Sequence, residues 1–211
     1  MKTILAGLGR QCAVAIAVVA AATVVLGIAY PAAVWVVSRV TSDSAEGSQV
    51  RDARGCDVGS SSIGIDPQVP NGRPDPYLHA RTVGAEGEPF APGDPAASAA
   101  SNQGPNSEAL RDRVLAKRAL IAAREGVAPT AVPADAVTGS GSGLDPHISV
   151  DYARLQIPRL ARENSRTQAQ VASLIDEHTQ GREWGFLGEP RVNVLEVNLA
   201  LGHTAADCGG R

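Results

Sequence analysis

The pattern of apolar and charged positions divides the chain into two parts. No charged residue occurs between Arg10 and Arg39, and the residues between them are almost all Ala, Val, Ile and Leu. This stretch is longer than the roughly 20 residues that a helix needs to cross the hydrocarbon core of a bilayer. A cleaved signal peptide is the alternative, but its apolar region is only about 7–15 residues long. We therefore expect a retained transmembrane helix at residues 11–38.

The flanks of this span predict its orientation. Lys2 and Arg10 precede it without any acidic residue, whereas Arg39 is soon followed by Asp43 and Glu46. Because basic residues beside a span favour the cytoplasmic side, we expect the N-terminus in the cytoplasm and the residues after the span outside the cell membrane. The expected organisation is a cytoplasmic N-terminus at 1–10, the span at 11–38, a linker at 39–57, an extracytoplasmic domain at 58–201 and a disordered tail at 202–211.

Helix signals follow in the second half of the chain, after a long irregular segment at 66–100 that is rich in Pro and Gly. Each expected helix begins at a polar residue whose side chain can cap the first turn. We expect helices from Asn106 or Ser107 to Glu125 with Gly126 as C-cap, from Ser149 with an interruption at Pro158, and from the capping-box pair Thr167 and Gln170. The apolar stripe of the first helix is interrupted at Lys117 and Arg118.

The last expected element is a strand. Alternation from Arg191 to Leu201 would place Leu195, Val197, Leu199 and Leu201 on one face. Before it, residues 184–190 read as a tight turn that presents Glu189. About three helices beside a small sheet predict an α+β domain, or an α/β one.

Composition narrows the function classes. The formal net charge is −3, so the chain lacks the basic surface that nucleic-acid binding requires. Of its three cysteines, Cys12 lies in the apolar span, and Cys56 and Cys208 lie outside it, where a disulfide could persist. Their spacing does not support a metal site.

A glycine- and serine-rich stretch at 132–149 carries the candidate chemistry. Residues 138–143 lack the Lys-Ser/Thr ending of a phosphate-binding loop, and Ser140 lacks the flanking pattern of a nucleophile elbow. We expect a shaped loop in which Asp145 orients His147 or caps the following helix, with no catalytic residue and no metal. One alternative stays open: Asp145, His147 and Glu189 could form a metal or hydrolytic site.

Four motifs in order resemble those of a known family. The run Val-Pro-x-Asp-x-Val-Thr at 132–138, continuing to Ser149, is similar to the signature of the C subunit of the Kdp potassium-transporting ATPase. The segments at 101–106, 156–161 and 187–201 resemble three further motifs of that family. Departures occur at 62–65 and at 81–83. The resemblance marks these positions as candidate interface or structural residues: Asn102, Asn106, Asp135, Thr138, Ser140, Asp145, His147, Gln156, Arg159, Glu189, Arg191 and Asn193.

The resemblance implies a non-catalytic subunit of a potassium pump in the cell membrane. In that family one subunit hydrolyses ATP and another, channel-like subunit conducts potassium. These two and a very small fourth subunit are the expected partners. The C subunit is expected to stabilise the complex and to act as a catalytic chaperone that raises the ATP affinity of the hydrolysing subunit. The resemblance implies no covalently bound cofactor, and ATP would be bound only through the complex with the hydrolysing subunit. The alternative is a free membrane-anchored binding protein or hydrolase that uses Asp145, His147 and Glu189.

Overall fold

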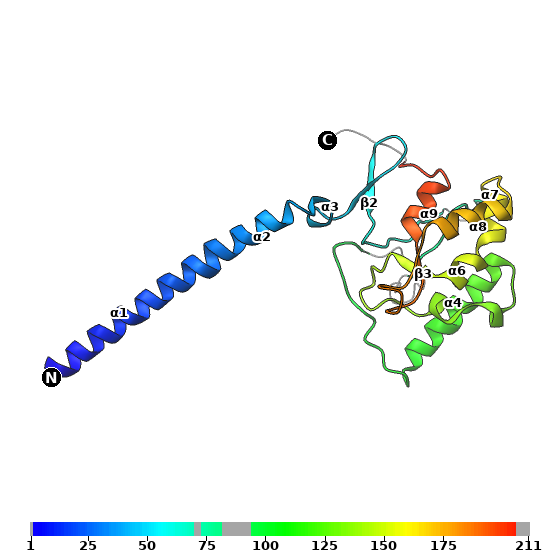
Figure 1. Ribbon diagram of the computed structural model, residues 1–211. Helices are drawn as coiled ribbons and strands as arrows, with labels where there is room; N and C mark the ends of the chain where they lie inside the picture. The colour runs from blue at the N-terminus through cyan, green and yellow to red at the C-terminus, as the bar shows by residue number, and fades with distance from the viewer. Residues whose placement is uncertain (1, 70–72, 82–93, 206–211) are drawn as a thin grey trace. The chain divides into compact units, whose positions relative to one another are not determined.

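The computed structural model describes residues 2–69, 73–81 and 94–205 (Figure 1). The chain divides into two compact units, Met1–Ser48 and Gln49–Arg211. Residues 49–57, which we expected in a linker, therefore belong to the second unit. They do so because β1 (Gln49–Arg51) pairs with β2 (Asp57–Ser60).

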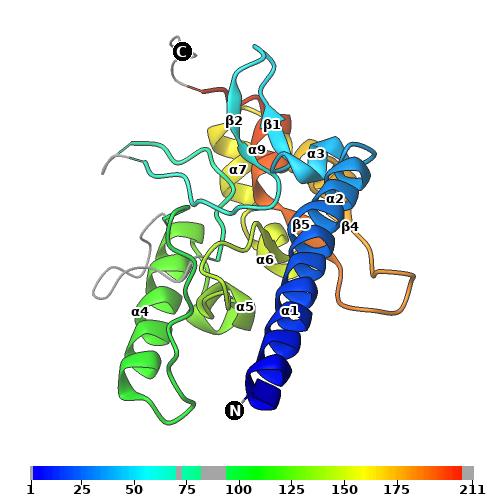
Figure 2. The ribbon, with the colours of Figure 1, turned by 90° about the vertical axis from the view of Figure 1, so that its left-hand side faces the viewer.

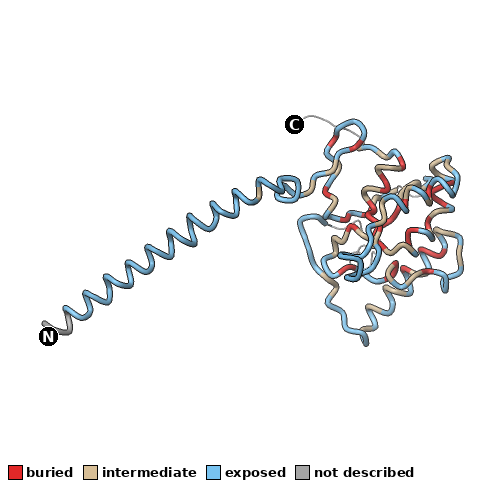
Figure 3. The backbone as a smooth tube through the Cα atoms, viewed as in Figure 1, coloured by how far each residue is buried: buried red, intermediate tan, exposed pale blue. Residues whose placement is uncertain are grey.

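The first unit is dominated by one long helical stretch. It comprises α1 (Lys2–Val24), a π-helical turn (Val25–Ala29) and α2 (Tyr30–Ser38), and the short α3 (Ser42–Ala45) follows. Its 33 residues from Ala6 to Ser38 are long and apolar enough to cross a membrane. Residues 6–37 are all exposed (Figure 3). A continuous apolar surface of this size is suited to contact with lipid or with other transmembrane helices.

The second unit contains a three-stranded antiparallel sheet in the order β3-β5-β4. The strands are short: β3 is His147–Ser149, β4 is Thr179–Gln180 and β5 is Arg191–Asn193. Ile148 of β3 lies opposite Val192 of β5, and both are 2% exposed or less. The centre of the sheet is therefore part of the hydrophobic core.

The three expected helices are present, and their caps are the expected residues. The side chain of Ser107 accepts a hydrogen bond at the start of α4 (Glu108–Glu125), and Gly126 ends that helix with a φ of 68°. Thr167 and Gln170 form a capping box at the start of α8 (Gln168–Glu177). These signals are local, so they could be read from the sequence.

The second expected helix is divided in two, as Pro158 predicted. Ser149 caps α6 (Val150–Leu155), and α7 (Ile157–Glu163) begins anew with Pro158 in its first turn. Proline is tolerated there because the first N–H groups of a helix have no intrahelical partner. Two short segments not expected from the sequence precede β3: a 3₁₀ turn (Pro129–Ala131) and α5 (Ala134–Val137).

The strand expected from Arg191 to Leu201 is wrong. The strand ends at Asn193, and α9 (Val194–Ala200) follows. The side chain of Asn193 accepts the N–H of Glu196, so Asn193 is a helix N-cap. The buried positions are Val194, Val197, Asn198 and Leu201, which have helical spacing. Leu195 and Leu199, which the strand prediction placed on the same face, are not among the buried residues.

The second unit is an α+β domain, as expected, with more helices than the three that we expected. Its core joins side chains from α4, α6, α7, α8, β5 and α9, among them Ile121, Tyr152, Leu160, Val171, Ile175, Val192 and Val197. The first four residues of the expected disordered tail, 202–205, are ordered, because the N–H of Ala205 donates to Asp52 at 2.8 Å. Residues 206–211 lie outside the described residues.

Candidate functional site

An extended segment, residues 77–80, is held by amide side chains instead of by a neighbouring strand. Asn198 of α9 accepts the N–H of Leu78 at 2.8 Å and donates to its carbonyl at 2.9 Å. Gln156, between α6 and α7, does the same for His79, at 2.9 and 3.2 Å. Buried peptide groups need such partners, so two of the resemblance motifs supply the groups that hold this segment.

The imidazole of His79 lies between two carboxylates. Its Nδ1 is 2.9 Å from Asp66 Oδ2, and its Nε2 is 2.7 Å from Asp75 Oδ2. Burial by itself lowers the pKa of His79, but the charge of Asp66 and the hydrogen bonds to both carboxylates outweigh it, and the net pKa is raised. Only the imidazolium form donates to both carboxylates at once, so the geometry selects the charged form.

Arg159 of α7 joins His79 and its carboxylates to α4. It is 3% exposed, and its guanidinium donates to both oxygens of Glu125 at 3.1 and 3.0 Å. It also donates to the carbonyls of Asp75 and Tyr77 and to Gln156. We call Asp66, Asp75, His79, Glu125, Gln156 and Arg159 the buried polar cluster. Its ionised members are paired and hydrogen-bonded, as burial of charge requires.

Sequence reasoning found Gln156 and Arg159 but missed the other members of the cluster. It also missed Lys117, which is 1% exposed and whose pKa burial lowers to about 8. A signal for Lys117 was present, because Leu110, Val114, Lys117 and Ile121 continue one helical stripe. No comparable signal marked Asp66, Asp75 or His79, which lie in the segment that we expected to be irregular.

The glycine- and serine-rich loop is shaped by its own polar residues. Asp145 accepts the N–H of His147 at 2.9 Å and pairs with Arg81. Partial burial would raise the pKa of Asp145, but the His147 N–H and Arg81 hold it below its usual value. Asp145 therefore binds the backbone of His147 within this turn. The Nε2 of His147 is buried and has no hydrogen-bond partner among the residues that the structure describes.

The other loop residues also make local contacts. Asp135 accepts the N–H of Ser149 at 3.0 Å. Thr138 donates to the carbonyl of Asp135, and the buried Ser140 accepts the N–H of Asp145. Gly64 packs against this loop so closely that a Cβ there would lie 2.3 Å from the Asp145 carbonyl oxygen. The loop and the segment at 60–64 therefore form one packed layer.

The remaining candidates are dispersed. Asn193 is 1% exposed and donates to the carbonyl of Ser61 at 2.9 Å, which fixes β5 to the segment after β2. Asn102 and Asn106 are exposed. Glu189 pairs with Arg182 in the connection between β4 and β5, and Arg191 at the start of β5 pairs with Glu183 of that connection.

The metal or hydrolase alternative gains no support from this arrangement. Among the described residues, no group of three or more His, Cys, Asp and Glu side chains could hold a metal ion. Asp145 and His147 are neighbours, whereas the carboxylate of Glu189 is bound to Arg182, and its side chain is 80% exposed. The structure therefore does not bring the three residues together as such a site would require.

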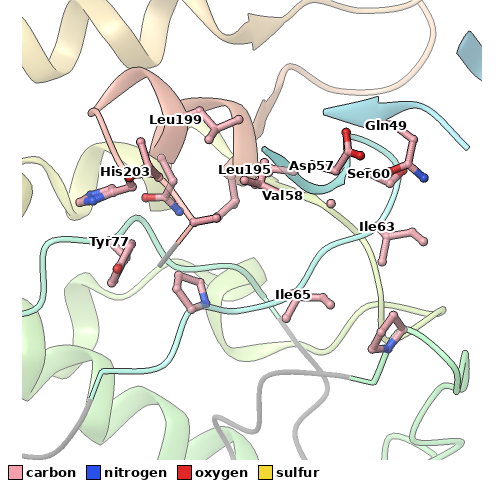
Figure 4. A pocket seen from close by; sticks show the side chains of 17 residues that line it. Gln49, Asp57, Val58, Ser60, Ile63, Ile65, Tyr77, Leu195, Leu199 and His203 are labelled. Carbon is pink, nitrogen blue, oxygen red and sulfur yellow. The ribbon is translucent and has the colours of Figure 1, made fainter. Parts of the chain in front are cut away.

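A cavity of about 620 Å³ lies between the β1–β2 hairpin, residues 63–67 and α9 (Figure 4). Its walls are mainly apolar, with Val58, Ile63, Ile65, Leu195 and Leu199 among them. Two of the polar residues that line it are already engaged: Asn198 binds Leu78, and the His203 ring contacts Tyr77 and Pro76. Burial, together with Arg166, lowers the pKa of His203. The volume is typical of a ligand site, but few groups are free to orient a polar ligand.

Comparison with known proteins shows which family the chain resembles. The family described as K+-transporting ATPase, c chain (KdpC), matches residues 12–203. A protein of Kineococcus radiotolerans named potassium-transporting ATPase KdpC subunit is 44% identical over 95% of this chain and 97% of its own length. Proteins of the same name from Caulobacter sp. and Mycobacterium bovis are 46% and 42% identical over 85% and 91% of this chain, and over 86% and 97% of their own lengths.

The fold and the site define a class: a small α+β domain with a buried polar cluster, joined to one helix that is long and apolar enough to cross a membrane. Within that class the chain belongs to the KdpC family of the K+-transporting ATPase. The resemblance found in the sequence motifs is therefore confirmed. The chain is an accessory subunit of that ATPase and not its catalytic subunit.

Proposed function

We propose that this chain stabilises the assembled potassium-importing ATPase and raises the affinity of the ATP-hydrolysing subunit for ATP. The observation that carries the proposal is the family match over residues 12–203, together with relatives of 42–46% identity that are matched over 86–97% of their own length. The partners are the ATP-hydrolysing subunit, the potassium-conducting subunit and a small fourth subunit. All of these come from the family resemblance.

The domain lies outside the cell membrane in this proposal, and the N-terminus lies in the cytoplasm. Two observations support the orientation. Lys2 and Arg10 flank the N-terminal end of the apolar helix without an acidic residue. In addition, Cys56 is disulfide-bonded, and disulfides persist mainly in oxidising compartments.

An extracytoplasmic domain cannot touch cytoplasmic ATP. The effect on ATP affinity must therefore be transmitted through the transmembrane helix and its contacts with the other subunits. Such coupling between distant sites is typically worth about 1–3 kcal/mol, which is a change of about 5- to 150-fold in affinity. The exposed apolar surface of the helix is the part of the chain available for these contacts.

The test is to purify the ATPase with and without this chain and to measure potassium-stimulated hydrolysis over a range of ATP concentrations. We expect the complex that lacks the chain to need about 5- to 150-fold more ATP for half-maximal activity. Subunit content is quantified on the same samples, so that a loss of assembly is separated from a loss of affinity. An unchanged ATP dependence in fully assembled complexes would refute the chaperone role and leave the assembly role.

The orientation has its own test. In a Cys12→Ala chain, a membrane-impermeant thiol reagent should label Ser44→Cys on intact cells and Thr3→Cys only after lysis. Ser44 lies in α3, after the apolar helix, and Thr3 precedes it. Labelling of Thr3→Cys alone on intact cells would reverse the orientation and remove the need for coupling through the membrane.

A further inference from the structure

Among the described residues of the second unit, the connection between β4 and β5 carries the largest exposed apolar side chains. In this segment, residues 181–190, Trp184 is 83% exposed, Phe186 is 69% exposed and Leu187 is 44% exposed. We call it the aromatic loop. Figure 2 shows it in orange, extending beyond β4 and β5. Three neighbouring large apolar residues in water are costly, and such clusters mark interaction sites.

The aromatic loop is held in one conformation by hydrogen bonds and ion pairs of its own, although it projects from the domain. The N–H of Glu183 donates to the carbonyl of Leu187 at 2.9 Å, and the reverse bond has the same length. Two ion pairs brace its base: Arg182 with Glu189 at 2.7 Å, and Glu183 with Arg191 at 2.8 Å. A loop that is already ordered loses little entropy on binding.

The backbone of Trp184 adds a second sign of function. Its φ is 50°, a conformation that a bulky residue rarely adopts, and Gly185 and Gly188 follow with φ of 82° and 76°. Backbone strain of this kind is found mainly where the surrounding structure imposes it for function. Here the turn with the unusual φ is the one that leaves the large indole ring 83% exposed.

The charges around the aromatic loop favour a protein surface over a lipid surface as its occupant. Loops and helices that bind anionic bilayers carry an excess of Lys and Arg beside their apolar residues. Arg182 in the aromatic loop and Arg191 directly after it are each paired with a glutamate of the loop, so these charges cancel at its rim. Trp, Phe and Arg at the centre of a patch with a satisfied polar rim are typical of protein interfaces.

We propose that the aromatic loop docks into an uncharged, apolar recess on another subunit of the potassium-transporting ATPase, with Trp184 and Phe186 as the anchors. This inference rests on the proposed function, because the partner is a subunit of the same complex. Since the rim is internally neutralised, attachment through the loop is insensitive to salt. The loop is thus one element through which the domain holds the assembly together.

The first experiment measures retention of the full-length chain in the complex. The chain is co-expressed with the other ATPase subunits, extracted in mild detergent and quantified against them. The double variant Trp184→Ala/Phe186→Ala should weaken retention at least tenfold, at low and at high salt. The matched control is Leu115→Ala/Leu120→Ala, which removes two side chains on α4 that are 54% and 46% exposed, and it should leave retention unchanged.

Folding is checked by the thermal unfolding of each purified chain in detergent, which should be the same for both double variants and the wild type. Retention of the Trp184/Phe186 variant at the wild-type level would overturn the proposal. An equal loss in the α4 control would also overturn it, because the effect would then not be specific to the loop. If the wild-type chain itself fails to co-purify, the proposed function fails instead.

A second experiment identifies what covers the loop. The chain has two tryptophans, so the emission of Trp184 is obtained as the difference between Trp35→Phe and Trp35→Phe/Trp184→Phe samples, in which the tryptophans of the other subunits cancel. This emission should shift to shorter wavelength in the assembled complex and remain that of exposed Trp in vesicles of phosphatidylcholine and phosphatidylglycerol that contain this chain alone. A shift in those vesicles without the other subunits would overturn the proposal in favour of the bilayer.

Discussion

His79 illustrates how the charge state of a single residue is set by the groups that contact it. Both ring nitrogens face carboxylates, those of Asp66 and Asp75, and the ring is 6% exposed. A neutral imidazole would donate to one carboxylate and direct a lone pair at the other. The charged form is therefore part of the folded structure, and its loss must weaken the segment that contains it.

The stability of the domain should therefore fall as the pH rises through the raised pKa of His79. The stabilisation is fully present below the ordinary value of 6.5, and it is lost above it because the folded state binds the proton more tightly than the unfolded state. Chemical unfolding of the full chain in detergent, repeated from pH 5.5 upward, measures this. His79→Gln should cost about 3–5 kcal/mol, because buried carboxylates lose their partner, and should abolish the decline.

Two other groups set the limits of that pH window. Burial lowers the pKa of Lys117 to about 8 from 10.5, so its contribution to stability rises with pH between these values and opposes the decline. Burial by itself raises the pKa of Asp75, but His79 and Arg159 outweigh it and lower the pKa to about 2 from 3.8, so its stabilisation is lost only in acid. The decline due to His79 is therefore best observed below pH 8. A wild-type profile that is flat there would contradict the charged form of His79.

Gly64 should tolerate no side chain. An added Cβ would lie 2.3 Å from the carbonyl oxygen of Asp145 and 2.8 Å from the Cα of Pro146, and both are backbone atoms that cannot rotate away. We expect Gly64→Ala to lower the free energy of unfolding by about 1–3 kcal/mol, the usual cost of overpacking. Gly141→Ala in the loop itself is the control, because nothing lies within 4 Å of its added Cβ. Equal melting temperatures for the two variants would refute the packed layer.

At the scale of elements, the sequence predicted what local signals determine. Ser107, Gly126, Ser149 and Thr167 lie at helix ends as expected, because a capping residue acts on its own turn. The prediction of a strand that reaches Leu201 is wrong because the apolar residues from 191 to 201 fit both an alternating and a helical spacing. Asn193 followed by Glu196 is a helix-start signal that should have decided between them.

The segment at 77–80 and the buried polar cluster could not be predicted in the same way. The hydrogen bonds that hold Leu78 and His79 come from side chains that are 120 and 77 residues away along the chain. Pattern and propensity describe neighbours within a few turns, and they carry no information on such pairs. The family resemblance marked Gln156 and Arg159 without showing what they bind.

Asn198 should therefore control the local stability of the segment at 77–80. Asn198→Ala removes both partners of the Leu78 peptide, and leaving buried donors or acceptors unsatisfied costs about 1–3 kcal/mol. Hydrogen exchange should show faster exchange of the Leu78 amide by about 5- to 150-fold. Asn198→Asp, which keeps the acceptor for that amide, is the control and should protect it better. Similar exchange in both variants would argue against the side-chain clasp.

At the scale of the whole molecule, the two ends of the described domain meet. The carboxylate of Asp52 accepts the N–H of Cys56 with one oxygen and the N–H of Ala205 with the other, at 3.0 and 2.8 Å. Cys56 is 6% exposed and disulfide-bonded, and Cys12 is free. The other cysteine outside the apolar span, Cys208, lies outside the described residues, so its pairing with Cys56 stays a prediction.

We expect Cys56 and Cys208 to be linked, because Ala205 is only three positions before Cys208 and is already bound beside the hairpin. Peptide mapping of the unreduced protein should recover the two cysteines in one cross-linked fragment. A bridge that closes so long a loop typically stabilises by about 2–4 kcal/mol, so Cys208→Ser should lower the melting temperature, and reducing agent should do the same to the wild type. Recovery of Cys208 as a free thiol in unreduced protein would contradict the pairing.

Because Asp52 lies near the start of the domain and Ala205 near its described end, the two ends of the domain lie side by side. The fold therefore does not depend on which element comes first in the chain. The order of the elements could be rotated along the gene, with a short linker between the natural ends and new termini at an exposed turn such as Gly141, and the same core would form. The one connection that cannot be moved is the join to the apolar helix.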